Sequence, residues 1–179
     1  MARKLYIAGN WKMNHTAAVA RDTIAALAAK VADVDAVDIG ICPTYTSLAA
    51  AAEAAAGSNV AIGAQNVHWE AKGAFTSQIS AGMLNEIPVG YSIVGHSECR
   101  QYFGDTNETV NKRVHAGLDA GLAIIMCCGE VLEQRQAGET NAVVAAQVKA
   151  GLNGVTAEQL ANVTIAYEPV WAIGTGETA

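Results

Sequence analysis

Six short apolar runs recur along the chain, each followed by polar residues and then by a segment with helical spacing. The runs cover residues 5–9, 37–42, 60–64, 91–95, 122–128 and 163–167. Because their apolarity is continuous rather than alternating, we expect strands of a parallel sheet that is covered on both faces. Helical spacing covers residues 16–32, 45–56, 78–86, 107–120 and 130–151, the last broken near Gly138. The order indicates repeated βα units.

Two architectures fit six strands at this spacing. An open doubly wound sheet would be complete in 179 residues, whereas a (β/α)8 barrel needs eight strands and about 250 residues. The sequence lacks the G-x-G-x-x-G motif that a dinucleotide-binding sheet would carry after its first strand.

Polar residues shortly after the strand ends favour the barrel, because all of these ends meet on one face of a closed barrel. These residues are Asn10, Lys12, Gln65, Asn66, His96, Glu98, Glu130 and Glu168. The chain shows no linker or low-complexity tract. We therefore predict a single domain over residues 1–179 that contains the first six strands of such a barrel.

The composition excludes several classes of partner. A formal charge of −6 argues against nucleic acid or an anionic membrane as the main partner. Four cysteines without paired spacing indicate free thiols in a reducing compartment. The sequence shows no signal peptide, and its apolar runs are too short to span a bilayer. A cytoplasmic location is expected.

Three of the polar residues have side chains suited to acid–base chemistry. Glu168 ends a buried strand before Pro169, which suits a general base whose pKa is raised by burial. His96 follows a glycine turn and is expected to open a helix, where a neutral imidazole is favoured and can donate a hydrogen bond. Lys12 suits a phosphate or an oxyanion. Taken singly, each residue also fits an ordinary structural role: Glu168 as a surface or capping carboxylate, His96 as a loop histidine and Lys12 as a solvated lysine.

The last residues have the composition of a lid. Glycines near its end would let backbone amides face an anion, although the spacing is not that of a Walker loop. The proposed lid residues are Pro169, Val170, Trp171, Ala172, Ile173, Gly174, Thr175 and Gly176, and the lid is expected to extend to residue 179.

A metal site is not expected. His96 and Glu98, with the later pair Cys127 and Cys128, share residue types with zinc deaminases, whose cysteines are separated by two residues after a proline. Adjacent cysteines on a strand point to opposite faces. We predict neither a metal nor a cofactor.

Five motifs together resemble the triosephosphate isomerase family, whose members are TIM barrels. They are GNWKMN (9–14), GAQNVHWEAKGAFTSQIS (63–80), VGHSECR (94–100), CGE (128–130) and AYEPVWAIGTG (166–176). The resemblance runs from residue 5 to the last residue in the family's order.

The resemblance implies a glycolytic and gluconeogenic isomerase that interconverts dihydroxyacetone phosphate and glyceraldehyde 3-phosphate without a cofactor. In that scheme Glu168 removes the carbon-bound proton, and His96 polarises the carbonyl. Lys12 stabilises the oxyanion and the phosphate, with Asn10 beside it. The catalytic set would also include Glu98, which would pair with Lys12 or position the histidine. The lid would close over the substrate, and Gly174 would offer its amide to the phosphate.

A homodimer is also implied. The loop 65–79 resembles an arm that docks into a second subunit, with Thr76 near the partner's Asn10 and Lys12. The expected interface residues are Met13, Gln65, Phe75 and Thr76. The chain departs from the family's usual residues at Ser77–Gln78, Cys99 and Glu177.

The chain is short for this family, whose members continue through two more strands. The first and last strands would then have unpaired edges. We expect the 179-residue chain to be inactive alone and to need a complementing C-terminal segment. The alternatives are a non-catalytic scaffold that keeps the family's surface, and a barrel that binds another phosphorylated sugar.

Overall fold

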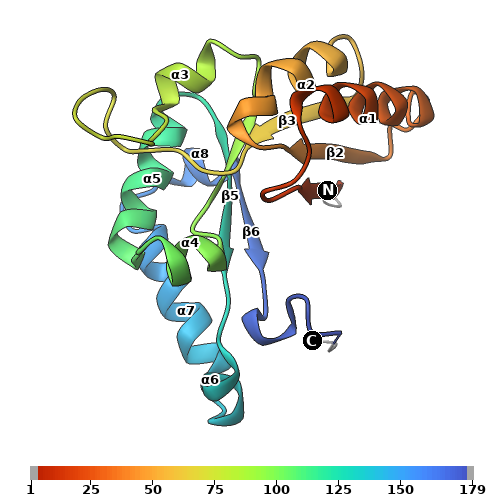
Figure 1. Cartoon of the computed structure of the whole chain (residues 1–179). Coiled ribbons are helices and arrows are strands. Elements are labelled where there is room, and N and C mark those ends of the chain that lie inside the picture. The colour runs from red at the N-terminus through yellow and green to blue at the C-terminus, as the bar shows by residue number, and fades with distance from the viewer. Residues whose placement is uncertain (1–3, 177–179) are drawn as a thin grey trace.

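Six parallel strands lie side by side in chain order in one curled sheet (Figure 1). The structure is a computed structural model that describes residues 4–176. The strands are β1 (Leu5–Asn10), β2 (Val37–Cys42), β3 (Val60–Ala64), β4 (Tyr91–Val94), β5 (Ala123–Cys128) and β6 (Val163–Tyr167). All six expected strands are therefore present, with ends shifted by at most one residue from the apolar runs. The sheet forms a half-barrel, the curved architecture of a TIM barrel.

Helices cover the outer side of this sheet, with α1 and α2 over β2 and β3, and with α5 and α7 beside β4 and β5 (Figure 1). Their bounds are α1 (Ala17–Lys30), α2 (Leu48–Ala55), α3 (Ala81–Asn85), α4 (Ser97–Tyr102), α5 (Asn107–Asp119), α6 (Leu132–Gln136), α7 (Thr140–Gly151) and α8 (Ala157–Leu160). Two short 3₁₀ segments, η1 (Tyr45–Ser47) and η2 (Val170–Ala172), complete the described elements.

Local sequence signals account for most helix ends. The side chain of Thr16 accepts a hydrogen bond from the amide of Val19 and caps α1. Gly138 separates α6 from α7 with a φ of +74°, a conformation that glycine adopts without strain. The short helix α8 was not predicted. It begins at a capping box formed by Thr156 and Gln159, a signal that was present in the sequence.

The main core lies between the sheet and its helices. On β5, Ile124 and Met126 belong to this outer core, whereas Ile125 and Cys127 belong to a smaller cluster with Tyr91. Successive residues of a strand point to opposite faces. The two clusters thus explain why the apolar run at 122–128 is continuous.

The strand β1 departs from the expected two-sided burial. Leu5 and Ile7 are 69% and 62% exposed, and Tyr167 at the end of β6 is 46% exposed. Within residues 4–176, β1 pairs only with β2, and β6 pairs only with β5. Each outer strand therefore lacks a neighbour whose side chains would cover it.

No helix within residues 4–176 has both the length and the apolarity that crossing a membrane requires.

Candidate active site

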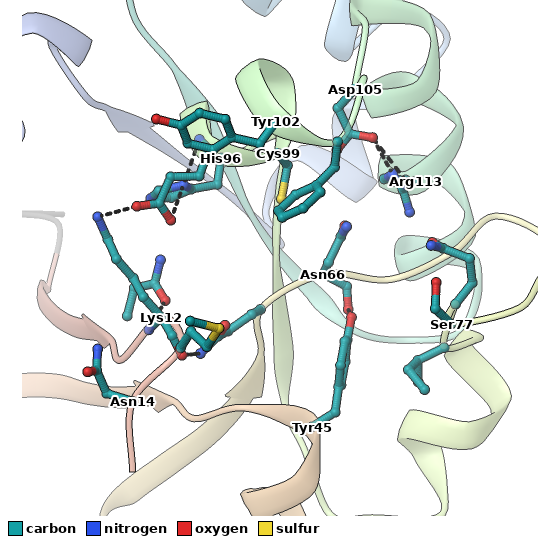
Figure 2. Close-up of a pocket in the computed structure, with 17 residues that line it drawn as sticks. Lys12, Asn14, Tyr45, Asn66, Ser77, His96, Cys99, Tyr102, Asp105 and Arg113 are labelled. Carbon is teal, nitrogen blue, oxygen red and sulfur yellow. Dashed lines mark hydrogen bonds and ion pairs between the residues drawn. The ribbon is translucent and has the colours of Figure 1, made fainter.

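The carboxyl ends of β1, β4 and β6 bring four side chains into one continuous line. The Nζ of Lys12 donates to Oε1 of Glu98 at 2.9 Å. At the other end of the line, Nε2 of His96 lies 3.2 Å from Oε1 of Glu168. Figure 2 shows Lys12 and His96 on different segments, and dashed lines join each of them to Glu98, which lies between them. The structure thus brings together the four residues predicted to be catalytic.

The tautomer of His96 follows from its position as the N-cap of α4. Its Nδ1 accepts a hydrogen bond from the amide of Glu98 at 3.1 Å. An Nδ1 that accepts a hydrogen bond carries no proton, so the proton of the neutral imidazole lies on Nε2. The approach of Glu98 Oε2 to Nδ1 at 3.5 Å is therefore not an ion pair. The buried imidazole presents a hydrogen-bond donor to Glu168.

The pKa of Glu168 differs from the sequence-based expectation. Burial raises this pKa and is the largest single effect, but the interactions of the carboxylate with His96, with the backbone of Ser97 and with Lys12 together lower it by more. The net direction is downward from the ordinary value of 4.5. The prediction that burial would raise the pKa toward neutrality is wrong for this arrangement, because the neighbouring donors outweigh desolvation.

Lys12 has a strained backbone, which the sequence did not indicate. Its φ is +52°, in the left-handed region that side chains other than glycine seldom adopt. Asn10 Oδ1 accepts from the amide of Lys12 at 2.9 Å, and Gln65 Nε2 donates to the Lys12 carbonyl at 2.8 Å. Two side chains from different strand ends therefore hold the strained residue, as is common at functional sites.

Glu130 is a buried carboxylate that the sequence analysis placed at a strand end without assigning it a role. It accepts hydrogen bonds from the hydroxyl of Tyr167, from Trp171 Nε1 at 3.0 Å and from the hydroxyl of Thr140. The carbonyl of Glu130 also accepts from the amide of Val170 at 3.1 Å. Glu130 therefore anchors the first half of the predicted lid to the end of β5.

The predicted lid forms the 3₁₀ segment η2 and a following turn. Gly174 and Gly176 have φ values of +72° and +82°, so both positions adopt conformations that favour glycine. The phosphate-binding role of Gly174 stays a prediction. Glu177, one of the departures from the family's usual residues, lies outside the described residues, as do the last two positions of the lid.

A cavity of about 690 Å³ borders this line of residues (Figure 2). Lys12, His96 and Glu98 form part of its wall, and Cys99 and Gln78 line it as well. Glu168 instead borders a separate cavity of about 220 Å³.

The residues predicted for an interface lie around the larger cavity or on the arm. Met13 and Gln65 line this cavity, and Met13 is 93% exposed. Phe75, in the turn of the arm, is 41% exposed. Thr76 follows it and is also exposed.

Within the described part of the chain, no group of three or more His, Cys, Asp or Glu side chains is placed to hold a metal ion.

The half-barrel and its strand-end residues define a class: an α/β barrel with a carboxylate, an imidazole donor and an ammonium at one face. A family model described as triosephosphate isomerase matches residues 5–179. The chain belongs to the triosephosphate isomerase family, which is a family of isomerases.

Individual relatives agree with this family. A triosephosphate isomerase from Carboxydothermus hydrogenoformans is 53% identical over 177 residues, covering 99% of this chain and 70% of the relative. One from Acetivibrio thermocellus is also 53% identical, covering 100% of this chain and 71% of the relative. The crystal structure of triosephosphate isomerase from Bartonella henselae matches with a TM-score of 0.87 at 38% identity, over 94% of this chain and 69% of that one. The chain thus spans about 70% of the length of these relatives.

Proposed function

We propose that this chain carries the catalytic groups of an enzyme that interconverts dihydroxyacetone phosphate and D-glyceraldehyde 3-phosphate through an enediolate, in glycolysis and gluconeogenesis in the cytoplasm. The observation that carries the proposal is the line from Lys12 through Glu98 and His96 to Glu168 at the strand ends. A non-catalytic scaffold would not need a carboxylate in contact with a neutral donor, and a cation linked to that donor through Glu98.

Glu168 and His96, which are neighbours at one end of the line, have proposed roles in proton transfer. Glu168 takes the proton from the carbon next to the carbonyl, and it returns that proton to the neighbouring carbon. The Nε2–H of His96 donates to the substrate oxygen as negative charge develops there. The low pKa of Glu168 depends on His96, so a substrate placed between them would raise that pKa and make the base stronger.

Lys12 is proposed to bind the substrate's phosphate and oxyanion. Its ion pair with Glu98 is partly exposed, with side-chain exposures of 35% and 39%. Pairs of this kind contribute about 0–1 kcal/mol. The ammonium of Lys12 can therefore leave Glu98 and bind a phosphate with only a small loss of free energy. Glu98 remains bound to His96 through its amide and continues to position the imidazole.

The segment from Pro169 to Gly176 is proposed to close over the substrate, with Gly174 donating its amide to the phosphate. Closure would exclude water from the enediolate. The contacts of Glu130 with Trp171 and Val170 support a hinged segment that is fixed at its first half.

The partner is proposed to be a second copy of the chain. The exposed Phe75 and the adjoining Thr76 form the tip of an arm, and the 690 Å³ cavity beside Lys12 offers a recess for such a tip. Exposed Met13 lies at the same cavity. The homodimer would thus place the partner's arm against the catalytic residues.

Catalysis is proposed to need a further complementing segment. Lys12 follows β1 and Glu168 follows β6, the two strands that have one neighbour each within residues 4–176. Their exposed apolar side chains, such as Leu5 and Ile7, would bury apolar area against added strands. We expect the 179-residue chain alone to be weakly active or inactive.

The test is an isomerase assay on the chain alone and on the chain mixed with the part of the Carboxydothermus relative that it does not match. We expect activity to rise by several orders of magnitude on mixing, and to disappear with Glu168→Gln. Mixtures without activity that nevertheless bind phosphoglycolate would favour the scaffold. Binding of another phosphorylated sugar in preference to phosphoglycolate would favour a different barrel. The active mixture is called the completed protein below.

A further inference from the structure

We propose that Gln147 of α7 is a positioning residue for the general base, acting on Glu168 through the backbone of Gly129. This inference rests on the proposed function, because it assigns a role in aligning the carboxylate that would remove the proton. Gln147 does not touch the carboxylate and is not itself a catalytic residue.

The side-chain amide of Gln147 makes hydrogen bonds to both the backbone N–H and the backbone C=O of Gly129. Its Oε1 accepts from the amide of Gly129 at 2.8 Å, and its Nε2 donates to the carbonyl of Gly129 at 3.1 Å. Two bonds of opposite direction fix the position and the orientation of Gly129. Inside a sheet, a neighbouring strand would make these two bonds to the backbone of Gly129. Gly129 lies one residue beyond the end of β5, at Cys128, and the side chain of Gln147 makes the bonds instead.

Gly129 in turn supports the backbone of Glu168. A Cβ atom built on Gly129 would overlap the carbonyl group of Glu168, so the two main chains are in direct contact at this point. On either side of this contact, the amide of Glu168 donates to the carbonyl of Cys128 at 2.8 Å, and the amide of Val170 donates to the carbonyl of Glu130 at 3.1 Å. A displacement of the Gly129 backbone would therefore also displace the backbone of Glu168.

The carboxylate has few other restraints. The carboxylate interacts with the backbone of Ser97, and its Oε1 contacts His96 at 3.2 Å, but its Oε2 is buried and has no hydrogen-bond partner among the described residues. A cavity of about 220 Å³, lined by Gly129, Gln147 and Glu168 among others, lies beside it and leaves room for movement. Because a misplacement of about 1 Å can cost about 100-fold in rate, the position of the backbone matters.

A general stabilising role is the competing explanation, and the chain offers a matched control. Asn111 of α5 is also a half-buried amide that bonds backbone carbonyls, those of Gly151 at 3.0 Å and Asn153 at 2.9 Å. Its partners lie at and just after the C-terminal end of α7, and neither belongs to the segment around Gly129 or Glu168. Asn111→Leu and Gln147→Met each remove two hydrogen bonds while nearly preserving the shape of the side chain.

The first readout is the titration of Glu168 by ¹³C NMR of the carboxyl carbon in the 179-residue chain, with the signal assigned by its loss in Glu168→Gln. Loss of alignment with His96 would weaken the interactions that lower the pKa of Glu168. We expect this pKa to rise toward its ordinary value in Gln147→Met and to stay unchanged in Asn111→Leu. This experiment does not depend on turnover, so it decides the positioning role even if the proposed isomerase activity fails.

The second readout is kinetic and uses the completed protein. We expect Gln147→Met to lower kcat at least tenfold and to change KM by less than twofold. Asn111→Leu should lose a similar amount of stability but leave both kcat and KM unchanged. Gln147→Glu keeps the acceptor for the amide of Gly129 and should give a smaller loss of kcat. If Gln147→Met fails to fold, Gln147→Leu, which also removes both hydrogen bonds without adding a charge, is titrated in its place. Equal effects of the Gln147 and Asn111 variants, or an unchanged Glu168 titration, would overturn the proposal.

Discussion

The ammonium of Lys12 and the carboxylate of Glu98 lie 2.9 Å apart, although 86 positions of chain separate them. Glu98 also contacts His96 through its own amide, so this one residue links the end of β1 to the end of β4. The proposed site depends on this link, because it places the cation and the neutral imidazole on the same side of the curled sheet.

Shortening the proposed base tests the alignment of the site. Glu168→Asp withdraws the carboxylate by one methylene, and we expect kcat of the completed protein to fall roughly 100-fold or more. Glu133→Asp, on the exposed side of α6, is the control and should leave kcat unchanged. An unaltered rate in Glu168→Asp would mean that another group removes the proton.

Removing the cation should weaken binding of a phosphorylated ligand. Lys12→Met loses a charge-assisted hydrogen bond, which contributes about 1.5–3 kcal/mol. We therefore expect the affinity of the completed protein for phosphoglycolate to fall about 10- to 100-fold in calorimetric titrations. Lys149→Met, an exposed lysine of α7, should bind normally. Equal affinities of the two variants would remove Lys12 from the phosphate site.

Acid should release the lid from Glu130. Burial raises the pKa of Glu130 and is the largest effect, but the hydrogen bonds from Trp171 and Tyr167, among others, lower it below its ordinary value of 4.5. A group with a depressed folded-state pKa stabilises the fold above its unfolded-state value, and this contribution is lost as the pH falls through the folded-state value. We expect the fluorescence of Trp171 to change as the pH falls below about 4.5.

The measurement uses Trp11→Phe with Trp69→Phe, so that the emission reports on Trp171. In this background Glu130→Gln should abolish the acid transition, whereas Glu53→Gln on α2 should retain it. A transition that persists in Glu130→Gln would assign the pH dependence to a different group.

A buried ion pair stabilises the loop that joins α4 and α5. The guanidinium of Arg113 donates from Nε and Nη2 to Oδ1 of Asp105, and from Nη1 to the carbonyl of Val67. Arg113→Met would leave the carboxylate of Asp105 buried without its cation, which costs about 3–5 kcal/mol. Urea unfolding should show this loss. Lys112→Met breaks an exposed pair with Glu108 and should cost less than about 1 kcal/mol.

The proposed dimer can be tested from both sides of its interface. Met13→Asp places a charge at the cavity, and Phe75→Ala removes the apolar tip of the arm. We expect each variant to sediment as a monomer at concentrations where the unaltered protein is a dimer. Met83→Asp, at an exposed methionine on α3 outside this cavity, should remain dimeric. Dimers that persist in both interface variants would exclude this surface.

Strand positions and most helix ends were predictable because they depend on local chemistry. The run at 122–128 is continuous because β5 is covered on both faces, and Thr16 caps α1 through a bond to a residue three positions away. The family motifs in the sequence also mark Lys12, His96, Glu98 and Glu168.

Other properties required the tertiary structure. The low pKa of Glu168, the left-handed backbone of Lys12 and the three donors around Glu130 all depend on residues that are distant in sequence. The amino-acid sequence by itself determined the strands, the helix caps and the identities of the reactive side chains, since these follow from side-chain chemistry and short-range spacing. Only the tertiary structure decided distances and pKa directions, because electrostatic and hydrogen-bond energies depend on which groups the fold brings within a few ångströms.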